Sequence, residues 1–548
     1  MTGLAILLLL AAMAHGISQR FRIPVIPLLL LSGLGLSIVS SLPFVTGMQK
    51  VLDPEHLKSI LQLGLTFLIF AAGVELNPMR IGKQRRAAWW VGIVEFVVTG
   101  ALGYLLAKAL GFDGMSTIYL ALALATSSTL IVLNQLRAWL RIYEPFARMV
   151  TGVLLIQDLL MIVCIVVMAN VDSPLQIMIR SILGVIALGG LAMACQQFLM
   201  PWLVLRFEIK SKFNTQLSKG RPARLDGETM LLFVVAVLFA FIGLSKWMGI
   251  PIVAGAFFAG FSFSSFPLNG LVRGVTQSIS GFFAALFFIA LGALIVLPSP
   301  DLIIKGLILS LSVLVVTPPL VTFVAEKTGL TSRYAIESGL LLAQTSELSL
   351  VLSLAGFLMG HISNEVFSII SLISVITMSI TPLIAHERTA ALLLHWHPTQ
   401  RRRELPPSDF TGHVIILGFG SGGMWVLKPL LKAGYTVVVV DDDPVIVQQL
   451  SRTDAICIRG DGADKALLKH INASEARIIL SGMRRLRDAE QLLKHVNGVP
   501  VIVRVFEDHQ AKAIEQLGGI PILNSEAACQ TFMQWFLRTG ITSSNPQA

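Results

Sequence analysis

Charged residues are scarce in this chain of 548 residues. Asp, Glu, Lys and Arg make up 14% of it, whereas apolar residues make up 54%, and the mean hydropathy is +0.76. A soluble domain carries about 25% charged residues, so most of this chain is too apolar to be surrounded by water. The shortage is uneven, because residues 1–385 are apolar runs broken by short polar loops, whereas 400–548 has the composition of a soluble α/β domain.

Cysteine is also rare. The four cysteines lie far apart and form no CxxC pair, which argues against a zinc or redox centre; they are Cys164, Cys195, Cys457 and Cys529. The first two fall in apolar runs, and the other two are expected to pack inside the soluble domain.

The net charge of +10 does not point to nucleic acid. The Lys and Arg residues lie in loops between the apolar runs and in a linker that contains Arg401, Arg402 and Arg403. Membrane topology and anionic lipid explain this distribution. We therefore expect membrane lipid, and no nucleic acid, as a partner.

The apolar runs are long enough to cross a bilayer whose hydrocarbon core is about 30 Å thick. The sequence predicts thirteen spans, at 3–17, 24–42, 57–77, 87–111, 115–136, 146–170, 175–199, 229–248, 250–266, 278–298, 302–325, 333–357 and 363–385. We expect an all-α polytopic membrane domain over residues 1–385, a linker over 386–410 and a Rossmann-like α/β domain over 411–548.

Basic residues predict the orientation of these spans. Lys and Arg are far more frequent on the loops after odd-numbered spans than on the loops after even-numbered ones. Since basic loops stay on the cytosolic side, we expect the N-terminus outside and the C-terminal domain in the cytosol.

One carboxylate lies in the middle of a predicted span. Asp158 follows Gln157 near the centre of 146–170, inside an apolar run. A charge at that depth costs several kcal/mol and is retained mainly where it lines a path. A lone carboxylate there binds either a cation or a proton, which is what exchange requires, although a structural aspartate satisfied by its neighbours is the alternative.

Two polar clusters interrupt other spans. Thr126, Ser127, Ser128 and Thr129 lie mid-span in 115–136, and Gln344 to Glu347 lie mid-span in 333–357. The hydroxyl groups could bond back to their own helix. Alternatively the helices are broken there, as in transporters whose discontinuous helices bind ions at the bilayer centre. The second interpretation predicts two repeats that cross beside Asp158.

Other acidic residues of the spans are expected near helix ends. Glu75 is predicted to cap a helix or anchor a loop at the cytosolic side, and Glu95 and Glu337 are predicted to reach interfacial water.

The C-terminal part contains a glycine motif, Gly418-x-Gly420-x-x-Gly423. It follows the apolar run 413–417, opens a helical stretch, and precedes a second strand that ends in Asp441. In this context glycines let backbone amides approach a phosphate, and the acidic residue accepts hydrogen bonds from ribose hydroxyls. Further strands are expected at 455–459, 476–480, 500–505 and 521–523. No second domain remains to hold a hydride acceptor, so we expect a regulatory nucleotide and no enzyme.

Taken together, these motifs resemble the Kef-type glutathione-gated potassium efflux systems of the second cation:proton antiporter family, which carry a C-terminal RCK (TrkA-N) domain. The motifs that carry the resemblance are 73–78, 125–129, Gln157-Asp158, 287–292, 344–348, 418–423, Asp441, 460–462 and 500–505.

The resemblance implies inverted repeats with crossed discontinuous helices, a homodimer in the inner (plasma) membrane, and alternating access around Asp158. It places Gln157, residues 126–129 and Glu347 at the cation and proton site, and adds Asp461 to a site for AMP or NAD(H). A glutamine before the aspartate implies K⁺ rather than Na⁺. The residues themselves leave open the choice between these ions, glutathione control and an ancillary regulatory subunit.

The sequence is compatible with three hypotheses for the function. The leading hypothesis is a potassium:proton antiporter gated by nucleotide, with a sodium:proton antiporter as the alternative. An RCK-gated channel would need a carbonyl filter such as TVGYG, which the chain lacks. A membrane-tethered oxidoreductase would need a hydride-accepting site. With one exchanging acid, electroneutral one-for-one exchange is expected.

Overall fold

The computed structural model describes residues 2–21, 23–40, 54–75, 84–138, 145–199, 227–265, 268–396, 410–420, 423–441, 444–450, 453–483, 486–496 and 498–523. The chain divides into two compact units, Met1–Leu394 and His395–Ala548. Cys529, Arg401, Arg402 and Arg403 lie outside the described residues, as do many basic loop residues on which the orientation was predicted.

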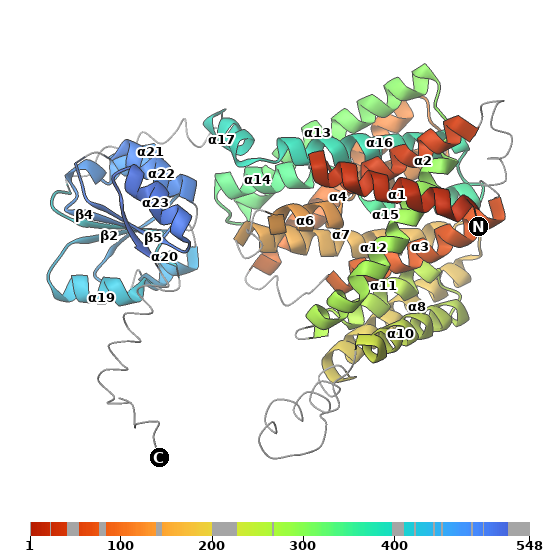
Figure 1. Cartoon of the computed structure of the whole chain (residues 1–548), viewed down its shortest axis with the longest axis horizontal. Helices are drawn as coiled ribbons and strands as arrows, with labels where there is room; N and C mark the ends of the chain where they lie inside the picture. Colours follow the sequence, from red (N-terminus) through yellow and green to blue (C-terminus); the bar gives the residue numbers. More distant parts are fainter. Residues whose placement is uncertain are drawn as a thin grey trace, which may run out of the picture. The chain divides into compact units, whose positions relative to one another are not determined.

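Each of the thirteen predicted spans corresponds to a helical segment in the described part of the first unit. Ten segments are long and apolar enough to cross a membrane, and three are shorter apolar helices. They are α1 (Thr2–Phe21), α2 (Val25–Ser40), α3 (Pro54–Glu75), α4 (Arg85–Ala109), α5 (Met115–Leu124) with α6 (Thr129–Ala138), α7 (Pro145–Ala169), α8 (Leu175–Ala194) continued by η4 (Cys195–Leu199), α10 (Gly227–Trp247), α11 (Ile252–Ser262), α12 (Leu268–Leu294), α13 (Pro300–Lys327), α14 (Ser332–Leu342) with α15 (Glu347–Leu358), and α16 (Asn364–Ile384). Figure 1 shows them as one bundle, followed by α17 (Glu387–Trp396), which occupies part of the predicted linker.

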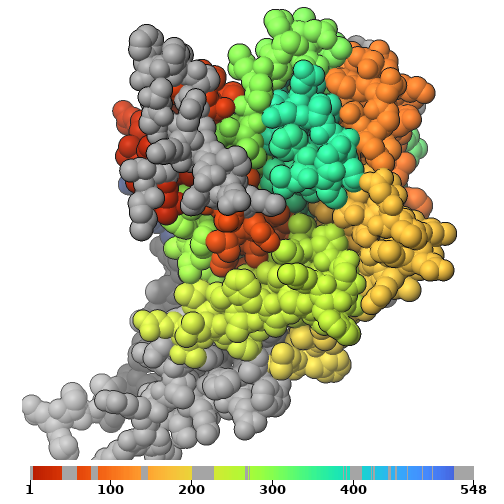
Figure 2. Space-filling model, turned by 90° about the vertical axis from the view of Figure 1, so that its right-hand side faces the viewer, coloured from red at the N-terminus to blue at the C-terminus, as the bar shows by residue number. Residues whose placement is uncertain are grey.

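The outer surface of the bundle is apolar. Large side chains on three helices are mostly exposed: Leu105 of α4 is 63% exposed, Ile186 of α8 65% and Leu232 of α10 70%. Figure 2 shows one side of this surface, where the segments coloured orange to yellow-green include these helices. Exposed apolar surface on this scale matches lipid, as expected for a multi-pass membrane protein.

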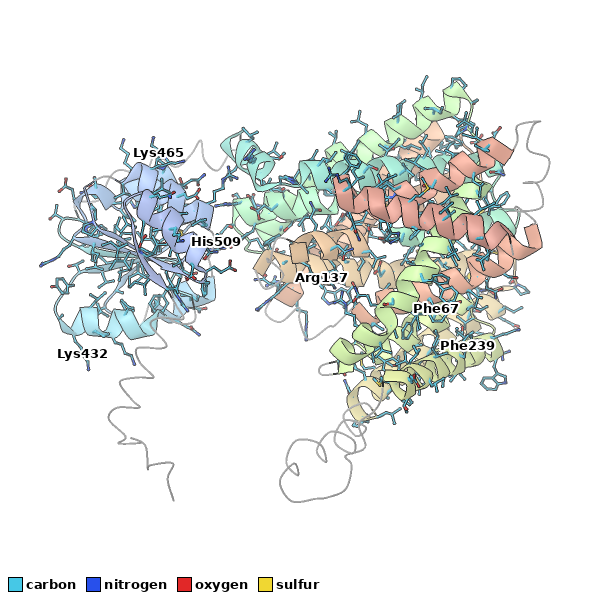
Figure 3. The ribbon with its side chains drawn as sticks, in the orientation of Figure 1. Phe67, Arg137, Phe239, Lys432, Lys465 and His509 are labelled. Atoms are coloured by element: carbon cyan, nitrogen blue, oxygen red, sulfur yellow. The ribbon has the colours of Figure 1, made fainter. Side chains whose placement is uncertain are left out.

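Apart from α8, which contacts both α11 and α7, the helices of the thirteen segments form two groups. We call α1, α2, α3, α10, α11 and α12 the scaffold helices, because α12 packs on α2 and α3, and α11 packs on α3 and α10. Two backbone contacts hold them closely: a Cβ at Gly33 would overlap the Ile289 carbonyl, and one at Gly73 would overlap the Phe257 carbonyl. Phe67, labelled in Figure 3, also stacks on Phe283 of α12 at 4.6 Å between ring centroids.

The second group consists of α4, α5, α6, α7, α13, α14, α15 and α16, which we call the site helices. Helix α4 packs against α5, α7 and α13, while α13 packs against α14 and α16, and α15 against α5 and α16. These helices carry both polar interruptions.

An ion-pair cluster joins the ends of three segments. Glu75 at the end of α3 accepts a hydrogen bond from Arg273 of α12 at 2.6 Å and pairs with Arg137 of α6 at 3.3 Å. Arg137 is labelled in Figure 3. The three residues lie at the end of or after the third, fifth and ninth predicted spans, which are all odd-numbered. Their contact therefore agrees with the prediction that successive spans cross the membrane in alternating directions.

A second polar cluster joins segment ends that follow even-numbered spans. His361 contacts the Tyr119 hydroxyl at 2.9 Å through Nδ1 and the Asp172 carboxylate at 3.0 Å through Nε2. The two clusters therefore contain residues from opposite sides of the predicted topology.

The second unit is a parallel six-stranded sheet with the strand order β3-β2-β1-β4-β5-β6. Its elements are β1 (Val414–Leu417), α19 (Met424–Lys432), β2 (Val437–Asp441), α20 (Pro444–Leu450), β3 (Ile456–Arg459), α21 (Lys465–His470), η5 (Ala473–Glu475), β4 (Ile478–Ser481), α22 (Leu486–His495), β5 (Val501–Val505), α23 (Asp508–Gln516) and β6 (Ile520–Leu523). Strands β1 and β2 are buried along their whole length and rich in Val and Ile, as central strands of a parallel sheet are. This is the predicted doubly wound fold, with the expected strands at nearly the expected positions.

Candidate functional site

Both polar interruptions are breaks in a helix. Helix α5 ends at Leu124 and α6 begins at Thr129, while α14 ends at Leu342 and α15 begins at Glu347. The prediction of discontinuous helices in the fifth and twelfth spans is confirmed. The alternative, in which the hydroxyl groups bond back to their own helix, is wrong for the central residues, because their hydroxyls reach other helices.

The two breaks cross and bind each other. The Ser127 hydroxyl donates to the Leu342 carbonyl at 2.7 Å, and the Ser349 hydroxyl donates to the Ala123 carbonyl at 2.8 Å. Each hydroxyl thus satisfies a carbonyl in the last turn of the opposite half-helix, where carbonyls lack partners of their own. The Thr126 hydroxyl lies 3.4 Å from that of Ser349 at the same crossing.

Two carboxylates meet the first break through adjacent residues. The Thr129 hydroxyl donates to Asp158 Oδ2 at 2.8 Å, and the Ser128 hydroxyl donates to Glu347 Oε1. Asp158 is 1% exposed and Glu347 5%. Since α6 and α15 both begin here, the positive ends of two half-helices lie beside the two acids and stabilise negative charge. The structure therefore brings together the acids that the sequence singled out.

Gln157 completes this arrangement. Its Oε1 accepts a hydrogen bond from the Ser127 backbone N–H at 3.1 Å. Among the described residues, Asp158 Oδ1 is buried without a hydrogen-bond partner. A buried carboxylate oxygen without a donor is costly unless a proton or a cation binds it, so the site can accommodate either ligand.

One residue of the site, Glu95, was not predicted from the sequence. Glu95 is the eleventh residue of α4 and only 3% exposed, and its Oε1 lies 3.2 Å from the Ser127 hydroxyl. The prediction that it reaches interfacial water is wrong, because α4 continues for several turns on both sides. The sequence does contain a signal for this burial. Gly92, Thr99 and Gly103 lie at helical intervals from Glu95, so these small residues share one face of α4 with it, and that face is buried.

Glu337 was also predicted to reach interfacial water, and that prediction is wrong as well. It is 5% exposed inside α14 and lies 3.6 Å from Arg333 in an ion pair one turn apart. Both partners belong to α14, so this ion pair lies within one helix.

The predicted nucleotide residues gather at the carboxyl edge of the sheet. Gly418 and Gly420 have φ angles of +72° and +56°, which glycine adopts without strain. A Cβ at Gly423 would overlap the ring of Phe419. The Asp441 carboxylate accepts a hydrogen bond from the Gly420 N–H at 3.0 Å, so the acid at the end of β2 lies against the glycine turn, as the motif requires.

Asp461 lies on the next loop of the same edge. Its Oδ1 accepts a hydrogen bond from the Ala463 N–H at 3.0 Å, and the preceding Gly460 N–H binds the Asp441 carbonyl at 3.1 Å. The turn after β3 is thereby joined to the end of β2. Ser421 and Gly422, which complete the glycine turn, lie outside the described residues.

Comparison with known proteins identifies the family. The transmembrane sodium/hydrogen exchanger family matches residues 5–386, and the TrkA-N domain matches residues 414–524. The chain is 25% identical over 495 residues to the glutathione-regulated potassium-efflux system protein KefC of Shigella flexneri serotype 5b, covering 87% of this chain and 76% of that protein. It is also 25% identical over 480 residues to KefC of Escherichia coli strain K12, covering 84% and 74%.

A solved structure has the same membrane fold. The sodium proton antiporter MjNhaP1 from Methanocaldococcus jannaschii aligns with a TM-score of 0.52 at 14% identity, covering 72% of this chain and 98% of that one. The predicted resemblance is thus confirmed, and the protein is a transporter rather than an enzyme. The chain belongs to the sodium/hydrogen exchanger family, as a multi-pass cation:proton antiporter with a C-terminal TrkA-N domain.

Proposed function

We propose that this antiporter exchanges potassium for protons by alternating access around Asp158, and that an adenine nucleotide bound to the TrkA-N domain regulates it. The observation that carries the proposal is the buried Asp158 Oδ1, which has no hydrogen-bond partner among the described residues. Its neighbours in the two breaks supply hydroxyl and carbonyl groups of the kind that replace the hydration shell of a monovalent cation.

Competition at one carboxylate gives the exchange. With a proton on Asp158 the site carries no cation, and with a cation bound the proton must leave, so the two ligands alternate. Glu347 keeps one state in this scheme, because the Ser128 hydroxyl and the start of α15 stabilise its ionised form. One exchanging acid gives electroneutral one-for-one exchange.

The choice of potassium rests on two supports. The residue beside Asp158 is the neutral Gln157, so this pair of neighbouring residues carries at most one negative charge instead of two, which favours a weakly hydrated ion. The matched relatives are also called potassium-efflux proteins. Sodium is the second candidate, since the protein of similar fold is called a sodium proton antiporter.

Alternating access requires the site helices to move against the scaffold helices. The Glu75–Arg137 pair joins α3 to α6 across this boundary at 3.3 Å, so it holds one face closed and must separate when that face opens. We place this face, with the TrkA-N domain, in the cytosol and the N-terminus outside, in the inner membrane. A homodimer is part of the same proposal.

Regulation is assigned to the edge of the sheet that carries Gly418, Gly420, Gly423, Asp441 and Asp461. The glycine turn and the start of α19 offer backbone N–H groups to a phosphate, and Asp441 lies where ribose hydroxyls are bound in this fold. AMP and NAD(H) share this chemistry, and both are candidates.

Flux through proteoliposomes tests the proposal. With a pH-sensitive dye inside, an outward K⁺ gradient should drive protons inward, and a proton gradient should drive K⁺ the other way. K⁺, Rb⁺ and Na⁺ are supplied in turn, and K⁺ and Rb⁺ should outperform Na⁺. A cation current without proton movement would indicate a channel and overturn the proposal, whereas preference for Na⁺ would overturn the potassium assignment alone.

A further inference from the structure

The Ser127 side chain lies between Glu95 and the end of α14. Its Oγ is 2.7 Å from the Leu342 carbonyl oxygen and 3.2 Å from Glu95 Oε1. Ser127 is 1% exposed, so these contacts are formed away from bulk water. Through its backbone N–H the same residue holds Gln157, the neighbour of Asp158. Ser127 therefore joins both breaks to Gln157, the residue next to the exchanging carboxylate.

Counting hydrogens at this junction assigns a proton to Glu95. A hydroxyl group has one hydrogen, and the shorter contact gives it to the Leu342 carbonyl, which can only accept. The contact between Ser127 and Glu95 then needs its hydrogen from Glu95, which is available only if the carboxyl group is protonated. An ionised Glu95 would compete for the Ser127 hydrogen and release the Leu342 carbonyl.

The surroundings of Glu95 favour the neutral acid. It lies in the middle of the continuous helix α4, and its side chain is 3% exposed, so the charged form would be kept away from bulk water. Two other carboxyl groups belong to the same crossing, which disfavours a further negative charge. In the described parts of α4, α5, α7 and α13, Lys and Arg occur only within about two turns of a helix end; they are Arg85, Arg86, Lys108, Arg148, Lys305 and Lys327. The remaining titratable groups of these helices are Tyr104, Tyr119, Cys164, Asp301 and Glu326.

We propose that Glu95 is a positioning residue of the exchange site, which keeps its proton throughout the cycle and donates it to Ser127. Held in this way, Ser127 directs its hydroxyl to the Leu342 carbonyl and its N–H to Gln157, so the cation meets a preformed site. The inference rests on the proposed function and deepens it, because it assigns a neutral carboxylic acid to cation affinity rather than to proton transport.

Two substitutions of Glu95 separate this role from a merely structural one. Glu95→Gln keeps a neutral donor of similar shape, so the KM for K⁺ and the number of protons moved per K⁺ should match those of the unaltered protein. Glu95→Leu removes the donor, and the KM should rise on the order of tenfold, the effect of one lost buried hydrogen bond, with the maximal rate nearly unchanged. Thr99→Val is the matched control, because the Thr99 hydroxyl donates to the Glu95 backbone carbonyl one turn away and not to the Glu95 carboxyl group.

The measurements use the full-length protein in proteoliposomes, with thermal melting to verify folding. An unchanged KM in Glu95→Leu would overturn the inference, and so would a changed proton count or pH profile in Glu95→Gln, since Glu95 would then carry protons itself. If Glu95→Leu fails to fold, Ser127→Ala should give the same rise in KM, and an unchanged KM there would also refute it. Absence of exchange in the unaltered protein would instead refute the proposed function.

Discussion

Replacing Asp158 by asparagine isolates the charge on which the exchange depends. The two side chains have the same shape, and the Asn Oδ1 can accept the Thr129 hydroxyl hydrogen that Asp158 Oδ2 accepts at 2.8 Å. The fold of the breaks should therefore survive. What disappears is one negative charge at a position that is 1% exposed.

The lost charge sets the size of the effect. Two unit charges about 4 Å apart attract each other by about 4 kcal/mol at an effective dielectric constant of about 20. At about 1.4 kcal/mol per factor of ten, cation affinity should fall about 1000-fold, and exchange should drop below detection. The free energy of unfolding should stay the same or rise, because a buried charge destabilises the fold when no cation is bound.

The assay is dye-monitored exchange in proteoliposomes, with melting of the same preparations. Glu337→Gln is the control, because it neutralises another buried carboxylate of the site helices, one that pairs with Arg333 of its own helix. This variant should retain exchange per folded molecule. If Asp158→Asn exchanged K⁺ within tenfold of the unaltered protein, the assignment of Asp158 would be refuted.

Three further predictions concern other parts of the chain. Gly420→Val, at φ +56°, should weaken adenine-nucleotide binding to the full-length protein in calorimetry and leave exchange without nucleotide intact; unchanged affinity would contradict the phosphate assignment. Burial lowers the pKa of His413 from 6.5, so below about pH 6.5 the unfolded chain binds a proton more readily than the folded one. The stability of the second unit should therefore be complete above about pH 6.5 and decline below it. Thermal melting should show this decline, and His413→Leu should remove it. Glu75→Gln should weaken the pairs with Arg137 and Arg273 by about 1 kcal/mol and speed amide hydrogen–deuterium exchange at the end of α6. An unchanged rate of amide exchange there would argue that the Glu75–Arg137 pair does not hold this face closed.

Much of the membrane architecture was predictable because lipid makes strict demands. A hydroxyl cluster or a carboxylate inside a long apolar run is costly unless the fold uses it, so Thr126 to Thr129 and Gln344 to Glu347 indicated the two breaks correctly. Strands β1 and β2 were equally visible, since buried parallel strands are continuous runs of Val and Ile.

The pairings inside the site were not predictable. Which hydroxyl binds which acid depends on the angles at which α4, α5, α7 and α14 cross. The spacing of residues along the chain does not determine these crossing angles. Glu95 was misassigned for this reason: its distance from the helix ends was judged from the sequence, whereas its burial follows from α5 and α7 packing on the small residues of α4. The hydrogen bond between Asp441 and the Gly420 N–H likewise arises from the register of β1 and β2.

The crossing of the breaks also constrains the order in which the protein is made. Ser128 and its partner Glu347 are 219 residues apart, which at about 5–20 residues per second is roughly 10–45 s of synthesis. During that interval the polar break of the first half has entered the membrane without the half-helices that satisfy it. Hydroxyl groups and free carbonyls are poorly tolerated in lipid. Until the twelfth segment is made, the polar break must therefore contact water, other helices or the insertion machinery instead of lipid. Truncated chains that end before Ser332 should therefore remain open to degradation, even though all the helices up to α13 are already present.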